Sequence, residues 1–343
     1  MELFKSLLEP SPVDGSATQK RMLCIVLSFN GRNDTVACLD GLLEKKIWGM
    51  DVLVVDNASE YGVVEHIAES HPEVEFLRLE ENLGWAGGNN AGIRIGLERG
   101  YDWICLLNND LVFPAGQAES WFNAVNGLPP ALVHPTIYYW SEPTVAQLHP
   151  DADETVEHRS VGNWHGKAVM NFAYGACLAV HHEVFQRVGL LDERFFLQLE
   201  ETDFHHRANK GGYLSVCDLN VKIFHKESRA FGGNRAPIKT YYSVRNSLLL
   251  IEKKKESLKL VFKDVISLYW SLSRLAGSDR DVNFLGKAEF MMWIFSNSLS
   301  ALAVRTGVQD YLFRNFGKIA QRKFLKLQQP AIFSSAENNT INS

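Results

Sequence analysis

Apolar runs alternate with amphipathic stretches along the first third of the chain. Residues 22–29 and 103–107 are continuous apolar runs, which is the pattern of strands buried on both faces of a sheet. Residues 34–46 repeat apolar side chains at helical spacing. This alternation predicts a mostly parallel sheet covered by helices on both faces. The remaining expected elements are strands over 52–55 and 74–79 and helices over 62–69 and 90–99.

The pattern loosens after Pro114. Residues 140–167 are polar without a clear period, which predicts an inserted loop or a two-stranded flap. Further elements are expected as strands over 174–180 and 213–216, helices over 182–188 and 202–210, and several amphipathic helices over 256–320.

Composition excludes some functions. A hydrophobic fraction of 46% provides a sizeable core, and a net charge of -5 argues against a general nucleic-acid binder. The most apolar C-terminal stretch, residues 290–304, is interrupted by polar residues and is shorter than the ~18 apolar residues that indicate a membrane span. No secretory signal is recognised, so the cytoplasm is the expected location. The five cysteines form no CxxC pair, which favours buried small hydrophobic side chains in a reducing compartment.

Ligands of parallel sheets bind beyond the carboxyl ends of the strands. The first such end carries Ser28 and Asn30, and the second carries Asp56 and Asn57. Carboxylate and amide groups of this kind can contact a base edge or a ribose. Capping of the next helix by Ser59 is the alternative, and both can hold.

A glycine-rich segment, residues 82–90, follows the third strand. Gly84, Gly87 and Gly88 let the backbone approach a ligand, and Asn90 is expected to cap the following helix. The segment is not GxGxxG and does not follow the first strand, which disfavours a dinucleotide-binding dehydrogenase. A tight connection without a ligand is the alternative.

The apolar strand over 103–107 ends in three polar residues, Asn108, Asn109 and Asp110. They either face a site or form a turn before Pro114. Asp110 is placed where a carboxylate could hold Mg²⁺ or Mn²⁺ against a diphosphate, since these ions prefer oxygen ligands.

Two later features carry candidate chemistry. Glu200, Glu201 and Asp203 begin a helix, where the helix dipole stabilises acids, and one of them could instead act as a general base. His225 ends an apolar run and precedes a glycine-rich loop over 231–235, a position that favours a metal ligand over an ordinary histidine.

The ordered set of these segments resembles the family 2 inverting glycosyltransferases, which have a GT-A fold. Within that family the chain is most similar to the bacterial rhamnosyltransferase-like branch, which builds cell-surface polysaccharides. The resemblance covers roughly residues 22–250. Besides the segments above, it rests on Gly-Ala-Cys-Leu-Ala-Val at 175–180 and Val-Gly-Leu-Leu-Asp-Glu-Arg-Phe-Phe at 188–196.

The resemblance implies a role for each candidate residue. Asp56 would contact the nucleobase, and Asp110 and His225 would hold the metal. Asn108 replaces the usual acid and would contact ribose. The other residues assigned to the donor pocket are Ser28, Asn30, Asn57, Trp85 and Asn90.

Glu201 stands where the family places its catalytic base, usually the Asp of a Glu-Asp pair, so the longer side chain would reach one methylene further. Residues given a supporting role are Glu200, Asp203, Arg235 and Arg245. Arg245-Asn246 matches a Tyr-Arg-Asn segment of the branch, for which the sequence suggests no role.

The expected activity is transfer of a sugar, with inversion, from a nucleotide-diphosphate donor to a glycan or lipid-linked acceptor. The resemblance favours dTDP-L-rhamnose, with UDP-sugars second. A non-catalytic sugar-nucleotide or glycan-binding module is a rival hypothesis. A nucleotidyltransferase ranks lower, because Ser28 to Arg32 lacks a glycine-rich basic loop.

The resemblance also suggests a domain division. Its parts are a flexible leader (1–21), a catalytic domain (22–250) with a nucleotide-binding half (22–112) and an acceptor half (113–250), amphipathic helices (251–325) and a disordered tail (326–343). The amphipathic helices would lie on the inner membrane face, as a peripheral contact, or pair two copies in a homodimer.

Overall fold

The computed structural model describes residues 21–148, 167–227, 236–254, 258–278, 282–283 and 285–328. The chain forms two compact units. The first holds the described residues up to Asn82, together with Gly87–Leu191 and Phe204–Glu227. The second holds Leu83–Ala86, Asp192–Asp203 and the described residues after Glu227.

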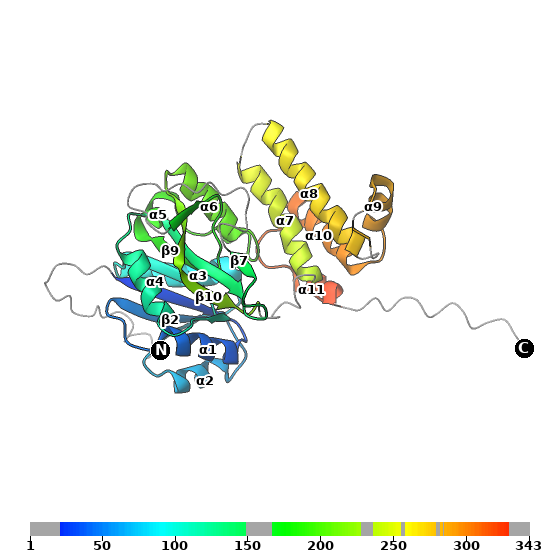
Figure 1. Cartoon of the computed structure of the whole chain (residues 1–343). Helices are drawn as coiled ribbons and strands as arrows, with labels where there is room; N and C mark the ends of the chain where they lie inside the picture. Colours follow the sequence, from blue (N-terminus) through cyan, green and yellow to red (C-terminus); the bar gives the residue numbers. More distant parts are fainter. Residues whose placement is uncertain are drawn as a thin grey trace, which may run out of the picture. The chain divides into compact units, whose positions relative to one another are not determined.

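The first unit contains a mixed, mostly parallel sheet (Figure 1). Within the described residues its strand order is β3-β2-β1-β4-β9-β6-β10-β5, with β7 beside β6 and β8 beside β10. Strands β1 to β4 are parallel to one another, β9 runs against β4 and β6, and β10 is parallel to β6. The strands are β1 (Met22–Ser28), β2 (Met50–Asp56), β3 (Glu75–Arg78), β4 (Trp103–Asn108), β5 (Leu111–Val112), β6 (Leu132–Tyr139), β7 (Ala146–Leu148), β8 (Lys167–Met170), β9 (Cys177–His181) and β10 (Ser215–His225).

Helices cover both faces of this sheet, as the sequence predicted. Side chains of β1 alternate between the faces. Cys24 and Val26 belong to one buried cluster with Leu39, whereas Ile25 points to the other face, against Gly92. The helices with residues in this unit are α1 (Arg32–Leu42), α2 (Val63–Ser70), α3 (Gly84–Glu98), α4 (Gln117–Asn126), α5 (His182–Val188) and α6 (Glu200–Lys210).

Helix α3 approaches the sheet closely because glycines repeat every four residues along its inner side. A Cβ atom added at Gly92 would lie 2.8 Å from Ile25, and one at Gly96 would lie 2.8 Å from Ile104. Gly88 is equally tight, at 2.5 Å from Leu27. Gly88 therefore serves packing against the sheet, rather than the close approach to a ligand that the sequence suggested.

Two expected helix boundaries and one expected helix cap are wrong. Helix α3 begins at Gly84 rather than near Asn90, because its glycines pack inward and do not break it. Helix α1 ends at Leu42 rather than at residue 46, since the apolar repeat stops there. Helix α2 begins at Val63 with Gly62 as its N-cap, so Ser59 does not cap it.

Residues 140–167 do not form a separate two-stranded flap within the part that the structure describes. Strand β7 pairs with β6, and β8 pairs with β10, so both extend the main sheet. Residues 149–166 lie outside the described residues. Because this segment is polar and has no clear period, its sequence did not predict the two short strands.

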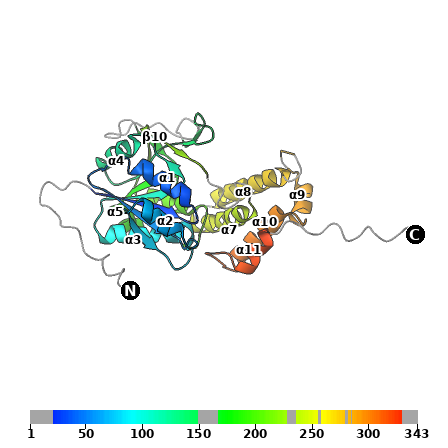
Figure 2. The same cartoon turned by 90° about the horizontal axis from the view of Figure 1, so that it is seen from below.

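The second unit is built mainly from helices, as expected for the C-terminal region (Figure 2). Helix α10 packs along α7 at Gly307, where an added Cβ would lie 2.8 Å from the Tyr241 carbonyl oxygen. Helix α11 extends past residue 326, the expected start of the tail; residues 1–20 and 329–343 lie outside the described part. None of the described helices is both long and apolar enough to cross a membrane. The helices are α7 (Pro237–Lys254), α8 (Leu258–Ser278), α9 (Lys287–Ile294), α10 (Leu299–Leu312) and α11 (Gln321–Gln328).

All five cysteines are free thiols buried in the first unit, which confirms the expectation of small core side chains. Burial raises the pKa of Cys38 to about 12, and it does the same for Cys217.

Candidate active site

The carboxyl ends of three parallel strands meet at one edge of the sheet. Ser28 at the end of β1 is in register with Asp56 at the end of β2. On the other side of β1, Leu27 is in register with Asn108 at the end of β4. Residues separated by up to 80 positions are thus aligned along one edge, where the sequence placed the donor pocket.

Asp56 is almost fully buried at this edge, with 1% of its surface exposed. Its two carboxylate oxygens accept hydrogen bonds from the backbone N–H of Ser59, at 3.2 and 3.3 Å. Arg78 Nε lies 3.7 Å from the same carboxylate. The carboxylate therefore shapes the loop after β2. Arg78 was not among the predicted site residues, although it too stands at the carboxyl end of a strand.

Asn30 joins the loops that follow β1 and β2. It has a left-handed backbone (φ 55°), its N–H donates to Ser59 Oγ at 2.8 Å, and its side-chain oxygen accepts from Glu60 N–H at 2.8 Å. Ser28 is fully buried, with its hydroxyl 2.9 Å from that of Thr35. Asn30 and Ser28 thus make structural contacts at this edge of the sheet.

Two other donor-pocket candidates are engaged by neighbouring side chains or backbone. The Asn57 amide nitrogen donates to Asn82 Oδ1 at 3.2 Å. Asn90 lies inside α3, where its amide donates to the Leu191 carbonyl (2.9 Å) and accepts from the Leu191 N–H (3.1 Å). Asn90 therefore ties α3 to the chain that follows α5.

Asp110 and His225 lie next to each other, as predicted for a metal site. His225 Nε2 is 3.1 Å from Asp110 Oδ1, and both residues are nearly buried. The pairing of β10 with β5 explains this proximity, because His225 is in register with Leu111, the residue after Asp110. The Lys226 N–H then donates to the Asp110 carbonyl at 3.1 Å.

The surroundings of His225 fit a bound cation. Gln147 Oε1 lies 2.9 Å from Nδ1, so an oxygen faces each ring nitrogen. A neutral imidazole donates from only one nitrogen, which leaves a lone pair opposed to an oxygen. A cation bound between Nε2 and the Asp110 carboxylate would relieve this opposition. Asn108 Nδ2, 3.4 Å from Nε2, completes the group, which we name the Asp110–His225 centre.

A different cluster also has metal-ligand spacing among the described residues. Ligand atoms of His181, His182 and Glu183 lie within 4.8 Å of one another. His181 is in register with Trp103, at the amino end of β4 and away from the donor edge. The His181 Nδ1 atom accepts from the Glu183 N–H at 3.4 Å. This cluster caps α5 and is separate from the predicted site.

In the second unit, Glu200 and Glu201 open helix α6. Burial raises the pKa of Glu200 well above its ordinary value, and repulsion from Glu201 raises it further. Burial also raises the pKa of Glu201, which is only half-buried by surface area. Glu200 is 3% exposed, and its Oε2 has no hydrogen-bond partner among the described residues. Glu201 is thus the more accessible of the two.

The supporting candidates have mainly structural contacts. Asp203 forms an ion pair with Lys253 at 2.7 Å, and Arg245 is completely buried. Trp85, which was assigned to the donor pocket, belongs to the second unit, where its N–H donates to the Phe196 carbonyl at 2.7 Å. Arg235 lies outside the described residues.

The family model for glycosyl transferase family 2 matches residues 23–189. That range contains the strand ends that carry Asp56 and Asp110. Residues 23–189 form a family 2 glycosyltransferase domain.

Curated relatives support the rhamnosyltransferase-like branch. This glycosyltransferase is 24% identical over 277 residues to dTDP-rhamnosyl transferase RfbF of Shigella flexneri, covering 77% of this chain and 91% of the relative. It is also 24% identical over 214 residues to an N-acetylglucosaminyl-diphospho-decaprenol L-rhamnosyltransferase of Mycobacterium tuberculosis, covering 54% and 70%.

Solved structures confirm the GT-A fold of the enzyme. The mannosyltransferase PcManGT of Pyrobaculum calidifontis, solved with GDP-Man and Mn²⁺, aligns with a TM-score of 0.52 at 16% identity. The alignment covers 90% of this chain and 92% of that one.

Replacing Asp110 by Asn tests the centre, because it removes the carboxylate charge and keeps the shape. We expect the variant to bind a nucleoside diphosphate with Mn²⁺ about 100-fold more weakly by calorimetry, since a ligand is lost. The matched control is Asp40→Asn, on the exposed side of α1. Equal metal-dependent binding by wild type and Asp110→Asn would contradict the assignment.

Proposed function

We propose that this glycosyltransferase transfers a sugar with inversion from a nucleotide-diphosphate donor to a glycan or lipid-linked acceptor in bacterial surface polysaccharide synthesis. The observation that carries the proposal is the Asp110–His225 centre, which lies at the same sheet edge as Asp56. The best donor candidate is dTDP-L-rhamnose, supported by the two rhamnosyltransferases among the relatives. UDP-sugars rank second.

Asp110 and His225 would hold a divalent cation, Mg²⁺ or Mn²⁺. A carboxylate and an imidazole leave further ligand positions for phosphate oxygens and water. When bound, the ion offsets the negative charge of the departing nucleoside diphosphate. In the same proposal Asp56 contacts the nucleobase, and Asn108 contacts ribose.

Glu201 is our candidate for the general base. Its carboxylate takes the proton of an acceptor hydroxyl, whose oxygen then attacks the anomeric carbon from the face opposite the diphosphate. The bond from that carbon to the diphosphate oxygen breaks, and the configuration inverts. The raised pKa of Glu201 suits this role, because a base works best with a pKa close to the operating pH.

The variant Glu201→Gln tests the base. It should retain donor binding and lose transfer by at least about 100-fold, which is the lower range for a lost acid–base group. Glu98→Gln, on an exposed turn of α3, is the control. Because burial raises the pKa of Glu201, kcat of the wild type should fall with decreasing pH at values above the ordinary carboxylate range. Full transfer by Glu201→Gln would refute the assignment.

A panel of nucleotide sugars with Mn²⁺ tests the donor. The true donor binds the native state and so raises its melting temperature; at 100 times Kd the stabilisation is about 2.7 kcal/mol. We expect dTDP-L-rhamnose to give the largest shift, ahead of UDP-glucose and GDP-mannose. A larger shift with a UDP-sugar would replace the rhamnosyl proposal, and the Asp110→Asn variant should remove most of either shift.

Helix α8 carries an apolar stripe that faces solvent. Phe262, Val265, Ile266 and Trp270 are between 40% and 67% exposed and follow helical spacing, so they form one line. The packing of Tyr269 against Phe290, with ring centroids 5.3 Å apart, connects this line to α9. Met291, Met292 and Phe295, on and just after α9, are also exposed, and we name these seven residues the α8–α9 face.

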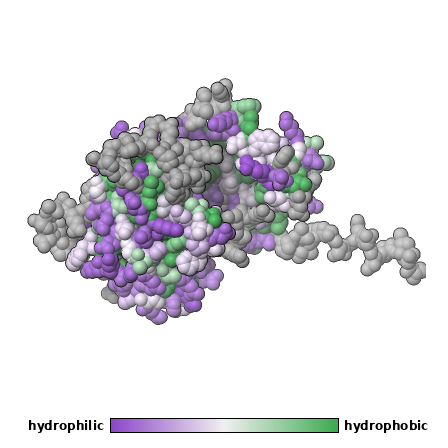
Figure 3. Space-filling model, viewed as in Figure 1, coloured by the Kyte–Doolittle hydropathy of each residue, from purple (hydrophilic) through white to green (hydrophobic). Residues whose placement is uncertain are grey.

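The C-terminal region that carries the α8–α9 face is basic. Residues 251–328 contain 14 Lys and Arg but 7 Asp and Glu, although the whole chain has a net charge of -5. Green apolar atoms lie among purple ones over these helices in Figure 3. We propose that the face contacts the anionic inner surface of the cytoplasmic membrane, where a lipid-linked acceptor would lie. A two-fold homodimer fits less well, because it sets like charges opposite each other.

Vesicle co-sedimentation tests this contact. The wild type should bind vesicles containing phosphatidylglycerol and bind pure phosphatidylcholine more weakly. Replacing Phe262 and Trp270 by Ser should weaken binding about tenfold or more, because two buried aromatic side chains are lost. The control replaces Trp48 and Tyr61, two exposed aromatics of the first unit. Absence of vesicle binding, with dimerisation that the Phe262/Trp270 variant abolishes, would assign the face to a second copy.

A further inference from the structure

The chain that leads into Glu200 and Glu201 has a strained backbone. Phe196, Gln198 and Leu199 have φ values of 63°, 74° and 72°, in the left-handed region that bulky L-residues rarely adopt. Such conformations persist only where surrounding contacts enforce them. The residues that enforce this one therefore control how α6 begins.

Asn246 contacts this strained segment most extensively. Its amide nitrogen donates to the carbonyl oxygens of Phe195 (2.9 Å), Leu197 (2.7 Å) and Gln198 (2.7 Å). Asn246 is completely buried on α7. One side chain thus collects three carbonyl groups that a regular helix or strand would have satisfied through backbone bonds.

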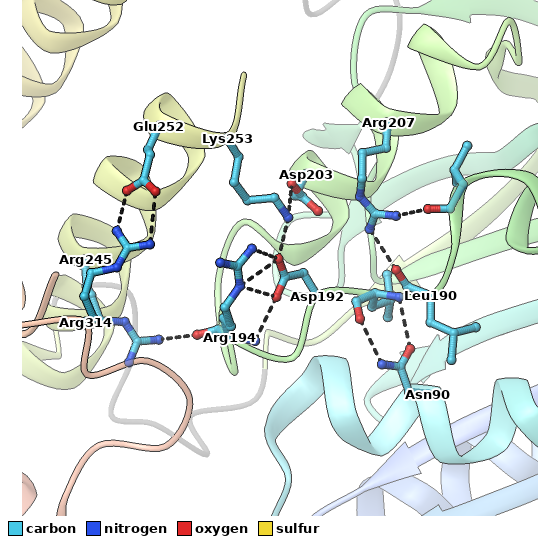
Figure 4. Close-up of polar contacts among 12 residues, drawn as sticks. Asn90, Leu190, Asp192, Arg194, Asp203, Arg207, Arg245, Glu252, Lys253 and Arg314 are labelled. Atoms are coloured by element: carbon cyan, nitrogen blue, oxygen red, sulfur yellow. Dashed lines mark hydrogen bonds and ion pairs between the residues drawn. The ribbon is translucent and has the colours of Figure 1, made fainter. Parts of the chain in front are cut away.

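Arg245 completes the contact from the adjacent position. Its Nη2 donates to the carbonyls of Arg194 (3.0 Å) and Phe195 (2.8 Å), and its Nη1 donates to the Gly317 carbonyl (2.7 Å). Its Nε donates to the Asn246 side-chain oxygen at 3.0 Å, which fixes the orientation of that amide. In Figure 4 the dashed line to the Arg194 carbonyl oxygen marks the bond from Arg245.

A third residue of α7 holds both ends of the same segment. Lys253 forms ion pairs with Asp192, where the segment begins, and with Asp203 in the first turn of α6. Arg194 also pairs with Asp192 at 2.7 Å, and Figure 4 shows these groups converging. Helix α7 therefore contacts residues 192–203 at its start, middle and end.

We propose that Asn246 and Arg245 are positioning residues for Glu201. They hold residues 194–199 in the strained form, so that α6 starts at Glu200, with Glu200 buried and Glu201 accessible. The proposal rests on the proposed role of Glu201 as the base, and it gives a function to the Arg245-Asn246 pair.

Two variants test the proposal. Asn246→Ala removes all three carbonyl contacts, and Arg245→Lys keeps the buried charge but loses the forked donors. Ser273→Ala is the control, because Ser273 is also fully buried in the second unit, and its hydroxyl bonds to the backbone of Leu285. All kinetics are measured well below each melting temperature.

We expect Asn246→Ala to lower kcat about 10- to 100-fold, because a displacement near 1 Å can cost 100-fold. Donor Kd and donor KM should stay within about twofold. Backbone amides of residues 196–201 should exchange hydrogen faster. Arg245→Lys should behave similarly but more weakly. Ser273→Ala should lower the melting temperature and leave kcat within about twofold, as a purely structural loss does.

Glu201→Gln in the same assay distinguishes a failure of the positioning role from a failure of the base assignment. If Glu201→Gln is inactive while Asn246→Ala and Arg245→Lys keep the kcat of Ser273→Ala, the positioning role is wrong and the base assignment stands. If Glu201→Gln transfers sugar normally, the base assignment fails, and the positioning role fails with it. If Asn246→Ala does not fold, Arg245→Lys decides on the same criteria.

Discussion

Two backbone pairings, Leu111 with His225 and Val112 with Phe224, hold the end of β10 against the chain that follows β4. Asp110 immediately precedes this ladder, so its carboxylate is fixed beside the imidazole of a residue 115 positions away. Neither side chain needs a long or flexible reach. The Asp110–His225 centre is therefore as rigid as the sheet itself, which is what a site of defined geometry requires.

Local patterns predicted the first half of the sheet well, because parallel strands with helical crossovers leave repeated signals in sequence. The apolar strands that end in the polar residues Ser28, Asp56 and Asn108 indicate that the strands are buried. They also indicate that the three polar residues lie at one edge of the sheet. The strand order beyond β4 could not be predicted in this way. It depends on the antiparallel insertion of β9 between β4 and β6, a long-range pairing without a local sequence signal.

Part of the candidate site could be predicted because its residues also follow apolar runs. Asp110 and His225 could be selected as candidates because each is a polar residue at the end of an apolar run. Gln147 was missed because its short strand lies in a polar segment without periodicity. Asn90 was expected to cap the helix that follows the glycines, but it lies inside α3, where its amide binds the backbone of Leu191. Backbone carbonyl partners of this kind are not visible in sequence.

The second unit shows how a buried polar pair can offset backbone strain. Each left-handed residue among Phe196, Gln198 and Leu199 costs on the order of 1 kcal/mol or more. The amide of Asn246 and the guanidinium of Arg245 offset that cost through several hydrogen bonds in a buried setting, where unmet carbonyls would be expensive. The backbone that leads into Glu200 and Glu201 therefore does not relax unless those hydrogen bonds break.

The burial of all five cysteines has a practical consequence. Thiol reagents attack the thiolate, and a group such as Cys38, buried and with its pKa raised to about 12, provides almost none of it in the folded protein. A cysteine introduced on the exposed side of α8 would therefore be the preferred target of a maleimide dye. Fluorescent or spin labels could be attached to the natural sequence background without first removing the native thiols.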